Sequence, residues 1–368
     1  MHLENISLIN FKNYSELELQ LSPYINCFVG DNGSGKTNLL DAINYLSLTK
    51  SAFNSVDSQN IRHNSDFFTI KGNFQVNDKK QTVLCIQKSG QKKVLKKNNI
   101  FYEKISDHIG QFPVVMIAPD DTDIIREGSD ARRRFLDSII SQINSAYLEN
   151  LILYNHYLKQ RNSLLKHFAL KNYIDHDLLE PYDRKLIHLG SLIYKEREKF
   201  IAEFLPVFVL HYNLLSEGKE TTHIVYNSDL QQQNLSEHFL QNLKKDLVLQ
   251  RTNCGIHKDD LLFEIEGFPL KKFGSQGHQK SFLIGLKLSQ FEIIKNEKSF
   301  PPLLLLDDIF DKLDDHRISK LLEMVSSGRF GQIFITDARP ERSERIFSSI
   351  KMECKIFKIT DGAASEVI

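Results

Sequence analysis

Gly30-Asp31-Asn32-Gly33-Ser34-Gly35-Lys36-Thr37 is the stretch of sequence that decides the fold of this chain. It matches the pattern G-x-x-x-x-G-K-[ST], it follows the apolar run 25–29, and a helical pattern begins directly after it at Asn38. Its glycines let the backbone curl, so that successive N–H groups form an anion-binding nest at the start of the helix. We therefore predict a phosphate-binding loop over residues 30–38, in which Lys36 reaches the β and γ phosphates of ATP and Thr37 places its hydroxyl on Mg²⁺. The alternative, a glycine-rich turn with one exposed lysine, is disfavoured by the strand and helix that flank the motif.

A second motif lies near the other end of the chain, where the apolar run Leu303 to Leu306 ends in Asp307 and Asp308. A buried parallel strand delivers acids of this kind to the carboxyl edge of a sheet. Asp307 is the candidate ligand of Mg²⁺, directly or through another ligand, and Asp308 is placed to orient or deprotonate the attacking water. A core strand followed by a solvated acidic turn is the alternative, and it is the weaker one beside a phosphate loop.

A third motif, Ser275-Gln276-Gly277, opens a segment with helical periodicity. Small residues and a serine at a helix start form an anion-binding terminus. Because one nucleotide rarely needs two such termini from one chain, we expect Ser275, Gln276 and Gly277 to contact the γ-phosphate bound to a second copy. ATP would then close a homodimer.

The order of these motifs resembles that of ABC-type ATPase heads such as those of SMC proteins and, within that group, of the RecF family. The resemblance runs from residue 1 to about residue 340, and further segments carry it: Asn10–Tyr14, Pro119–Asp121 with Gly128, Arg132–Asp137, Gly255–Leu261 and Leu313-Asp314. It implies an α/β fold in which an ABC-type ATPase head, built from a P-loop NTPase sheet with flanking helices and an antiparallel β subdomain, carries an inserted helical arm lobe.

The resemblance also has departures. His278 stands where the family usually has glutamine, which implies an altered or pH-sensitive polar contact near the nucleotide. Asp308 stands where most ABC-type heads carry glutamate, and its shorter reach implies slow hydrolysis. Thr336-Asp337 lies where such heads often carry a switch histidine.

Hydrophobic periodicity divides the chain into two lobes. Residues 1–120 alternate short apolar runs with turns, which is typical of strands, and we expect strands at 3–11, 15–21, 25–29, 67–76 and 81–87. Residues 131–213 follow four-three spacing, which predicts a hairpin of two helices of about 20 to 30 residues each, the second ending near Pro206. We expect an ATPase head from residues 1–125 and 251–368 and a helical arm from residues 126–250.

The chain's charge is balanced, with 47 basic and 47 acidic residues among 368, so no global field draws it to DNA. Contact with DNA would have to come from local patches. Two candidates are a predicted hairpin with Lys92, Lys93, Lys96 and Lys97 and a helix start with Arg132 and Arg133. A solvated face is the alternative for the lysines, and internal carboxylates are the alternative for the arginines.

The four cysteines are far apart and match neither a disulfide framework nor a metal-ligand spacing. The sequence has no signal-peptide pattern at Met1 and no apolar stretch near the roughly 20 residues that span a bilayer. We therefore expect a cytoplasmic protein without a membrane partner.

Together these patterns predict an ATPase switch that dimerises on duplex or gapped DNA and releases it on slow hydrolysis. The resemblance implies a role in recombinational repair at gapped or stalled replication sites, where the RecR and RecO mediators help a recombinase load on single-stranded DNA. Two alternatives stay open: a structural DNA scaffold that binds ATP without turnover, and an ATPase head that carries a metal-dependent nuclease. The chain has no spare acid-rich module after Asp308 for the latter.

Overall fold

The computed structural model describes residues 1–171, 173–231, 234–309, 328–348 and 352–367. They form two compact units, Met1–Asp121 with Ile284–Ile368 and Thr122–Leu283. The sequence predicts lobe boundaries after residues 125 and 250. The boundaries between the compact units fall after Asp121 and Leu283. Residues 251–283 lie in the second unit because one of their two strands pairs with a strand that follows the arm helices, and the other strand pairs with the first.

The first unit contains an antiparallel sheet of six strands in the order β2-β1-β4-β5-β6-β7. The strands are β1 (His2–Phe11), β2 (Tyr14–Gln20), β4 (Phe67–Val76), β5 (Lys79–Lys88), β6 (Val94–Lys97) and β7 (Ile100–Phe101). Asn77-Asp78 and Asn98-Asn99 join neighbouring strands, and all four residues have positive φ. Two-residue hairpin turns require this conformation, and Asn and Asp tolerate it best.

The second sheet of this unit is mostly parallel and has the order β15-β14-β3-β13-β12-β8. Its strands are β3 (Ile25–Val29), β8 (Val114–Ile117), β12 (Leu303–Leu306), β13 (Ile333–Asp337), β14 (Cys354–Thr360) and β15 (Ala363–Glu366), and β15 alone is antiparallel to its neighbour. Every residue of β3, β12 and β13 is buried. Burial on both faces explains why these strands are continuous apolar runs in the sequence.

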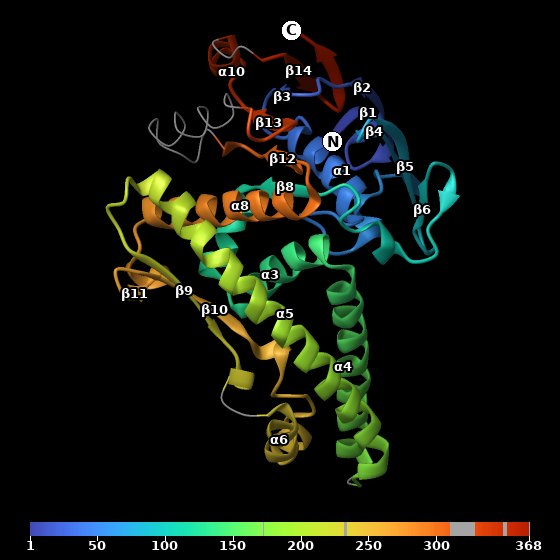
Figure 1. Cartoon of the computed structure of the whole chain (residues 1–368). Helices are drawn as coiled ribbons and strands as arrows, with labels where there is room; N and C mark the ends of the chain where they lie inside the picture. Colours follow the sequence, from blue (N-terminus) through green and yellow to red (C-terminus); the bar gives the residue numbers. More distant parts are fainter. Residues whose placement is uncertain (172, 232–233, 310–327, 349–351, 368) are drawn as a thin grey trace. The chain divides into compact units, whose positions relative to one another are not determined.

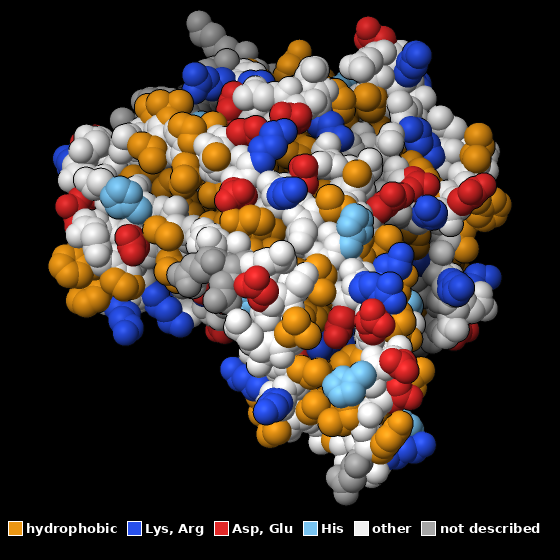
Figure 2. Space-filling model, turned by 60° about the horizontal axis from the view of Figure 1, so that its bottom comes forward, with side chains coloured by type: hydrophobic (Ala, Val, Ile, Leu, Met, Phe, Trp, Pro, Cys, Tyr) orange, Lys and Arg blue, Asp and Glu red, His pale blue; other side chains and the backbone are white. Residues whose placement is uncertain are grey.

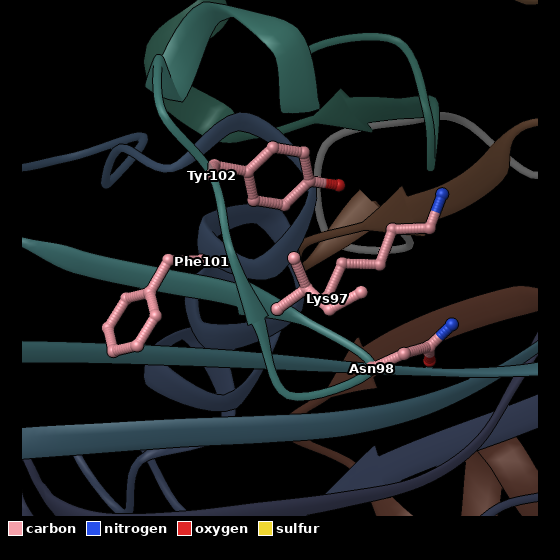
Figure 3. A pocket seen from close by; sticks show the side chains of 5 residues that line it. Lys97, Asn98, Phe101 and Tyr102 are labelled. Atoms are coloured by element: carbon pink, nitrogen blue, oxygen red, sulfur yellow. The ribbon is translucent and has the colours of Figure 1, made fainter.

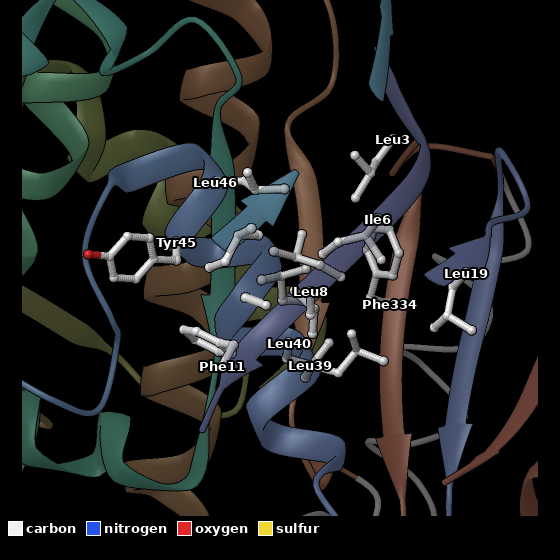
Figure 4. Close-up of a cluster of buried hydrophobic side chains, with 14 of the residues drawn as sticks. Leu3, Ile6, Leu8, Phe11, Leu19, Leu39, Leu40, Tyr45, Leu46 and Phe334 are labelled. Atoms are coloured by element: carbon white, nitrogen blue, oxygen red, sulfur yellow. The ribbon is translucent and has the colours of Figure 1, made fainter. Parts of the chain in front are cut away.

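Helix α1 (Lys36–Leu48) joins the two sheets of the first unit into one core. It contacts β13 and β8 of the parallel sheet as well as β4, β1 and β5 of the antiparallel sheet. Figure 4 shows Leu39, Leu40 and Leu46 of this helix among Ile6 and Leu8 of β1. Since burial on nearly all sides fixes α1, the loop that precedes it has a rigid support. The described part of this unit also contains helix α10 (Pro340–Ser348) and the 3₁₀ turns η1 (Asp57–Asn60), η2 (Ile105–His108) and η3 (Pro119–Thr122).

The second unit consists of helices and a three-stranded antiparallel sheet in the order β11-β10-β9. Its helices are α2 (Asp123–Arg126), α3 (Ser129–Ile143), α4 (Ser145–Lys171), α5 (His176–Ser216), α6 (Leu235–Leu249) and α7 (Leu270–Phe273). Its strands are β9 (Thr222–Asn227), β10 (Asp260–Ile265) and β11 (Phe268–Pro269), with the 3₁₀ turns η4 (Asp229–Gln231) and η5 (Ile256–Lys258). Helix α8 (Gln276–Lys298) begins in this unit and ends in the other.

The predicted helical hairpin is present as α4 and α5, which run alongside each other (Figure 1). The predicted length of its second helix was wrong, because α5 has 41 residues, about 60 Å at 1.5 Å per residue, and contains Pro206. Proline removes one N–H donor from a helix. Here Phe204 and Phe208 stack across that position, and packing keeps the helix continuous.

Within the described ranges, no helix combines the length and the apolar character that crossing a bilayer requires.

Candidate functional site

The loop between β3 and α1 has a backbone that only glycine accommodates at two positions. Gly30 has φ +153°, and a Cβ there would lie 2.3 Å from the main-chain oxygen of Ile359. Gly35 has φ +119°, and a Cβ there would lie 2.4 Å from the side-chain nitrogen of Asn13. The motif's glycines are therefore explained by close packing as well as by dihedral angles.

The turn between β1 and β2 braces this loop. Asn13 Nδ2 donates to the oxygen of Ser34 at 3.0 Å, and Asn13 Oδ1 accepts from Asn38 Nδ2 at 2.7 Å. The Tyr14 hydroxyl donates to the oxygen of Gly35 at 2.9 Å, and burial raises the pKa of Tyr14 so that it stays a neutral donor. The sequence pattern predicted no role for Asn10–Tyr14 beyond the family resemblance. Its role is to hold the loop.

Lys36 is 4% exposed and lies over the loop that it belongs to. Its Nζ donates to the oxygens of Gly30 and Asp31 at 2.8 and 2.9 Å. Asp31, Asn32 and Gly33 are exposed. The ammonium therefore lies beside an exposed loop with positive φ at Gly30, Gly33 and Gly35, which fits the expected anion nest.

The acid pair lies at the carboxyl edge of the parallel sheet, beside this loop. Thr37 Oγ1 donates to Asp307 Oδ1 at 2.9 Å, and Thr336 Oγ1 donates to the same oxygen at 2.8 Å. Burial raises the pKa of Asp307, while the hydrogen bonds from Thr336 and Thr37 lower it and the charge of Asp308 raises it further. The structure thus brings the predicted residues Lys36, Thr37 and Asp307 together.

This donor set fits Mg²⁺. A hydroxyl and a carboxylate are hard oxygen ligands, and Mg²⁺ in nucleotide sites takes one or two such protein ligands together with phosphate oxygens and water. Thr37 Oγ1 and Asp307 Oδ1 are already within 2.9 Å of each other, at the end of the loop that is predicted to bind the phosphates.

Asp308 differs from Asp307 in its surroundings. Its backbone has φ +45°, a conformation that is uncommon for residues other than glycine. Its N–H donates to Thr336 Oγ1 at 2.8 Å, whereas its buried Oδ1 has no hydrogen-bond partner among the described residues. A carboxylate oxygen in this state has unused capacity to accept a hydrogen bond.

The two residues of the candidate switch segment, Thr336 and Asp337, have different contacts. Thr336 contacts both members of the acid pair, as described above. Asp337 instead accepts from Ser343 Oγ at 2.7 Å and pairs with Arg342, and its main-chain oxygen accepts from the N–H of Gly30 at 3.3 Å. Thr336 is therefore the member that faces the site. Leu313-Asp314, which also carries the family resemblance, lies outside the described residues.

The predicted signature residues lie in the second unit, whereas the loop and the acid pair lie in the first. Ser275 directly precedes α8, and its Oγ accepts from the N–H of His278 at 3.1 Å. Ser275 and Gln276 are exposed and Gly277 is partly exposed. The predicted helix start is present and accessible.

The arginine run has internal partners. Arg132 donates from Nε and a terminal nitrogen to the two oxygens of Asp260, at 2.6 and 3.0 Å. Arg133 donates to the main-chain oxygen of Asp259 at 2.6 Å and pairs with Asp130. Of the two alternatives for these residues, the structure favours internal carboxylates.

The four lysines of the predicted hairpin differ in their exposure and contacts. Lys93 is largely buried, with Nζ 2.9 Å from Asp57 and 4.7 Å from the centre of the Tyr45 ring. Lys92 is exposed, and Lys96 is partly exposed with Nζ 4.3 Å from the centre of the Phe101 ring. Lys97 donates to Gln111 at 3.2 Å and lines a shallow pocket of about 220 Å³ with Asn98, Ile100, Phe101 and Tyr102, in which Phe101 and Tyr102 point to opposite sides (Figure 3).

One face of the molecule agrees with the balanced charge of the sequence. On the face drawn in Figure 2, Lys and Arg side chains are interspersed with Asp and Glu. Any attraction for a polyanion therefore depends on local groups such as Lys92.

Comparison with known proteins defines the class first. A family model described as the RecF/RecN/SMC N terminal domain matches residues 2–361. The Smc head domain of Pyrococcus furiosus has the same fold, with a TM-score of 0.58 at 16% identity over 100% of this chain and 96% of that chain. The predicted α/β fold of an ABC-type ATPase head is thus confirmed.

Closer relatives then define the family. The chain is 50% identical to the DNA replication and repair protein RecF of Flavobacterium johnsoniae, over 98% of this chain and 100% of that protein. It is 46% identical to the RecF protein of Cytophaga hutchinsonii, over 100% and 97%. A solved structure of the recombination mediator protein RecF-ATP in the RecFOR pathway has a TM-score of 0.90 at 30% identity, over 100% and 98%. The chain belongs to the RecF family of DNA replication and repair proteins, as its motifs predict.

Proposed function

We propose that this chain is an ATP-dependent switch of recombinational repair and replication restart. The observation that carries the proposal is the 2.9 Å hydrogen bond from Thr37 Oγ1 to Asp307 Oδ1. It joins the phosphate loop to the acid pair in the arrangement that a nucleotide with Mg²⁺ requires. The solved RecF-ATP structure, from a protein 30% identical to this one, supports ATP as the nucleotide.

Each residue of the site has a task in this proposal. The loop Gly30 to Asn38 binds the phosphates, and Lys36 contacts the β and γ phosphates. Thr37 and Asp307 hold Mg²⁺, which when bound neutralises the charge that develops on the phosphates. Asp308 accepts a hydrogen bond from the attacking water through its unpartnered oxygen and orients it. The short reach of an aspartate at this position makes hydrolysis slow.

Closure requires a second copy. Ser275, Gln276 and Gly277 of one protomer bind the γ-phosphate held by the other, so that ATP drives dimerisation on duplex or gapped DNA. Residues 1–125 and 251–368 act together as the ATPase head because they hold all three motifs, and residues 126–250 form the arm. Lys92, Lys96 and Lys97 contact DNA phosphates, and Lys93 keeps the hairpin folded. Mediators of the RecR and RecO type bind the DNA-bound dimer in the cytoplasm.

The first test is sedimentation of the protein with a labelled gapped duplex, with and without ATP and Mg²⁺. We expect ATP to produce a DNA-bound dimer that Lys36→Ala and Ser275→Arg both abolish. Lys244→Ala and Ser163→Arg, which change exposed residues of the second unit, are the matched controls and should behave as wild type. A protein that stays monomeric, or that binds DNA equally well without nucleotide, contradicts the proposal.

Asp308→Asn separates the switch from a structural scaffold. A scaffold binds ATP without turnover, so the substitution leaves its DNA complex unchanged in amount and lifetime. A switch needs hydrolysis for release, so the same substitution prolongs the lifetime of the DNA-bound dimer after free ATP is removed. Dissociation of the labelled duplex, followed after dilution into ATP-free buffer, distinguishes the two.

A further inference from the structure

The start of helix α8 is capped by a reciprocal pair of hydrogen bonds. Ser275 Oγ accepts from the N–H of His278 at 3.1 Å, and His278 Nδ1 accepts from the N–H of Ser275 at 3.3 Å. This is the arrangement of a capping box, in which the third residue after the serine is usually glutamate or glutamine. Here a histidine ring supplies the acceptor.

The ring has a second contact that an ordinary capping box lacks. His278 Nε2 lies 2.9 Å from Oε1 of Glu220. Because Nδ1 accepts a hydrogen bond, the single proton of the neutral ring is on Nε2, which donates to Glu220. The carboxylate therefore selects the tautomer that is able to cap the helix.

Glu220 is itself held in place. Its other oxygen, Oε2, accepts from the hydroxyl of Tyr212, a fully buried side chain of α5. Glu220 follows the end of α5 and precedes β9, and only about a quarter of its side chain is exposed. A continuous series of hydrogen bonds thus leads from α5 through Glu220 and His278 to Ser275.

We propose that His278 and Glu220 are positioning residues that hold Ser275 in the orientation needed to receive the γ-phosphate of the second protomer. Glu220 acts through His278, because it fixes the ring's proton and leaves Nδ1 free to accept from Ser275. The contact with Tyr212 links this orientation to the arm helix α5. The inference rests on the proposed function of Ser275 and deepens it.

Substitutions separate positioning from simple capping. His278→Ala removes the acceptor, and we expect dimerisation with ATP and Mg²⁺ to weaken about tenfold, the scale of a lost helix cap. Glu220→Ala leaves the ring without its selected tautomer and should weaken dimerisation about threefold. His278→Gln restores a side-chain oxygen that needs no tautomer, so dimerisation should return close to wild type, and adding Glu220→Ala should then have no effect. His223→Ala, an exposed histidine on β9, is the matched control.

The measurements are sedimentation equilibrium for dimerisation, titration with a fluorescent ATP analogue for nucleotide affinity, and thermal unfolding. The proposal expects a loss of dimerisation with unchanged nucleotide affinity, because the phosphate loop belongs to the other unit. The lost cap of His278→Ala also lowers the unfolding temperature, and this alone does not affect the proposal. Parallel losses in nucleotide affinity and unfolding temperature indicate a merely structural role and overturn it. Equal behaviour of all variants and wild type also overturns it, as do additive effects of His278→Ala and Glu220→Ala. If wild type does not dimerise with ATP, the proposed function fails and this inference fails with it, whereas failure of the inference alone leaves wild-type dimerisation intact.

Discussion

The phosphate loop at residues 30–37 and the segment Gly255–Leu261 are equally conspicuous in the sequence, yet the structure uses them in opposite ways. In the loop, Asp31, Asn32 and Gly33 are exposed and the backbone is open to an anion. In the segment, His257, Asp259 and Asp260 contact other parts of the second unit. Asp259 binds Arg197 at 2.8 Å and the Tyr226 hydroxyl at 2.5 Å.

Two other residues of the segment, Asp260 and His257, also have partners within the second unit. Asp260 holds Arg132 through two hydrogen bonds, and His257 Nδ1 lies 2.8 Å from the Tyr154 hydroxyl. Burial lowers the pKa of His257 to about 4, so its ring is neutral near pH 7. A family-specific motif is thus either a site or a structural junction, and an exposed loop backbone beside the charged groups distinguishes the site from the junction. The predictions below test that distinction, from the largest expected effect to the smallest.

The largest effect on stability should come from removing Arg197, a buried cation that binds Asp259 of the segment Gly255–Leu261. Arg197 is 1% exposed and contacts Asp137 and Asp259, both at 2.8 Å. Arg197→Met leaves two carboxylates without their partner, and we expect the free energy of unfolding to fall by about 3–5 kcal/mol. Urea unfolding followed by circular dichroism measures it.

Arg184→Met is the matched control for this prediction. Arg184 lies on the same helix, but its pair with Glu180 is exposed, with nitrogen and oxygen 3.3 Å apart. It should cost less than about 0.5 kcal/mol. Equal costs for Arg197→Met and Arg184→Met would show that the junction is not structural.

The matching change in the loop site should affect ligand binding instead of folding. Asp307→Asn keeps an oxygen that accepts from Thr37 and Thr336 but loses the charge that Mg²⁺ needs. We expect ATP affinity in the presence of Mg²⁺ to fall about thirtyfold, or about 2 kcal/mol, with little change in unfolding. Calorimetric titration of ATP measures the affinity. Asp337→Asn, which weakens the pair with Arg342, should give the reverse pattern of lower stability and unchanged Mg²⁺ dependence.

The Mg²⁺ requirement should depend on pH. Burial raises the pKa of Asp307, so its proton competes with Mg²⁺ at a higher pH than the proton of an exposed aspartate does. As pH falls through that raised pKa, the Mg²⁺ concentration for half-maximal ATP-induced stabilisation should rise, by up to about tenfold for each pH unit. Thermal shift titrations over the mildly acidic range measure this. A pH-independent requirement in wild type, or the same trend in Asp307→Asn, contradicts the assignment.

The smallest expected effect is on the salt dependence of DNA binding, and two adjacent lysines test it. Lys92 is exposed, so Lys92→Ala should remove one phosphate contact and reduce the slope of log affinity for DNA against log salt by about one. Lys93 is engaged with Asp57 and Tyr45, so Lys93→Ala should lower stability and leave the slope unchanged. Fluorescence anisotropy with a labelled duplex at several salt concentrations measures the slopes. If Lys92→Ala leaves the slope unchanged, Lys92 does not contact DNA.

Sequence patterns predicted the local features of the molecule well. The strands expected at 3–11, 15–21, 25–29, 67–76 and 81–87 are all present within one or two residues, because alternation and turn residues are local signals. Lys36, Thr37 and Asp307 also lie together as predicted, since parallel strands deliver their carboxyl ends to one edge.

Features that depend on distant partners were not predictable from local patterns. The pairing of β9 with β10 crosses α6 and assigns residues 251–283 to the second unit. The helix end predicted near Pro206 was wrong, because packing of Phe204 against Phe208 keeps the helix continuous through the proline. The burial of Lys93 depends on Asp57, which no periodicity relates to it.

The position of β3 at the centre of the parallel sheet has a consequence for the synthesis of the protein. Its two neighbours, β13 and β14, are drawn from residues 333–360, and the oxygen of Ile359 packs against Gly30. The ribosome makes the phosphate loop within the first tenth of translation but supplies the strands that shape it only near the end. A nascent or prematurely terminated chain therefore holds the complete loop motif without its sheet, and competence to bind nucleotide is reached only when translation is nearly finished.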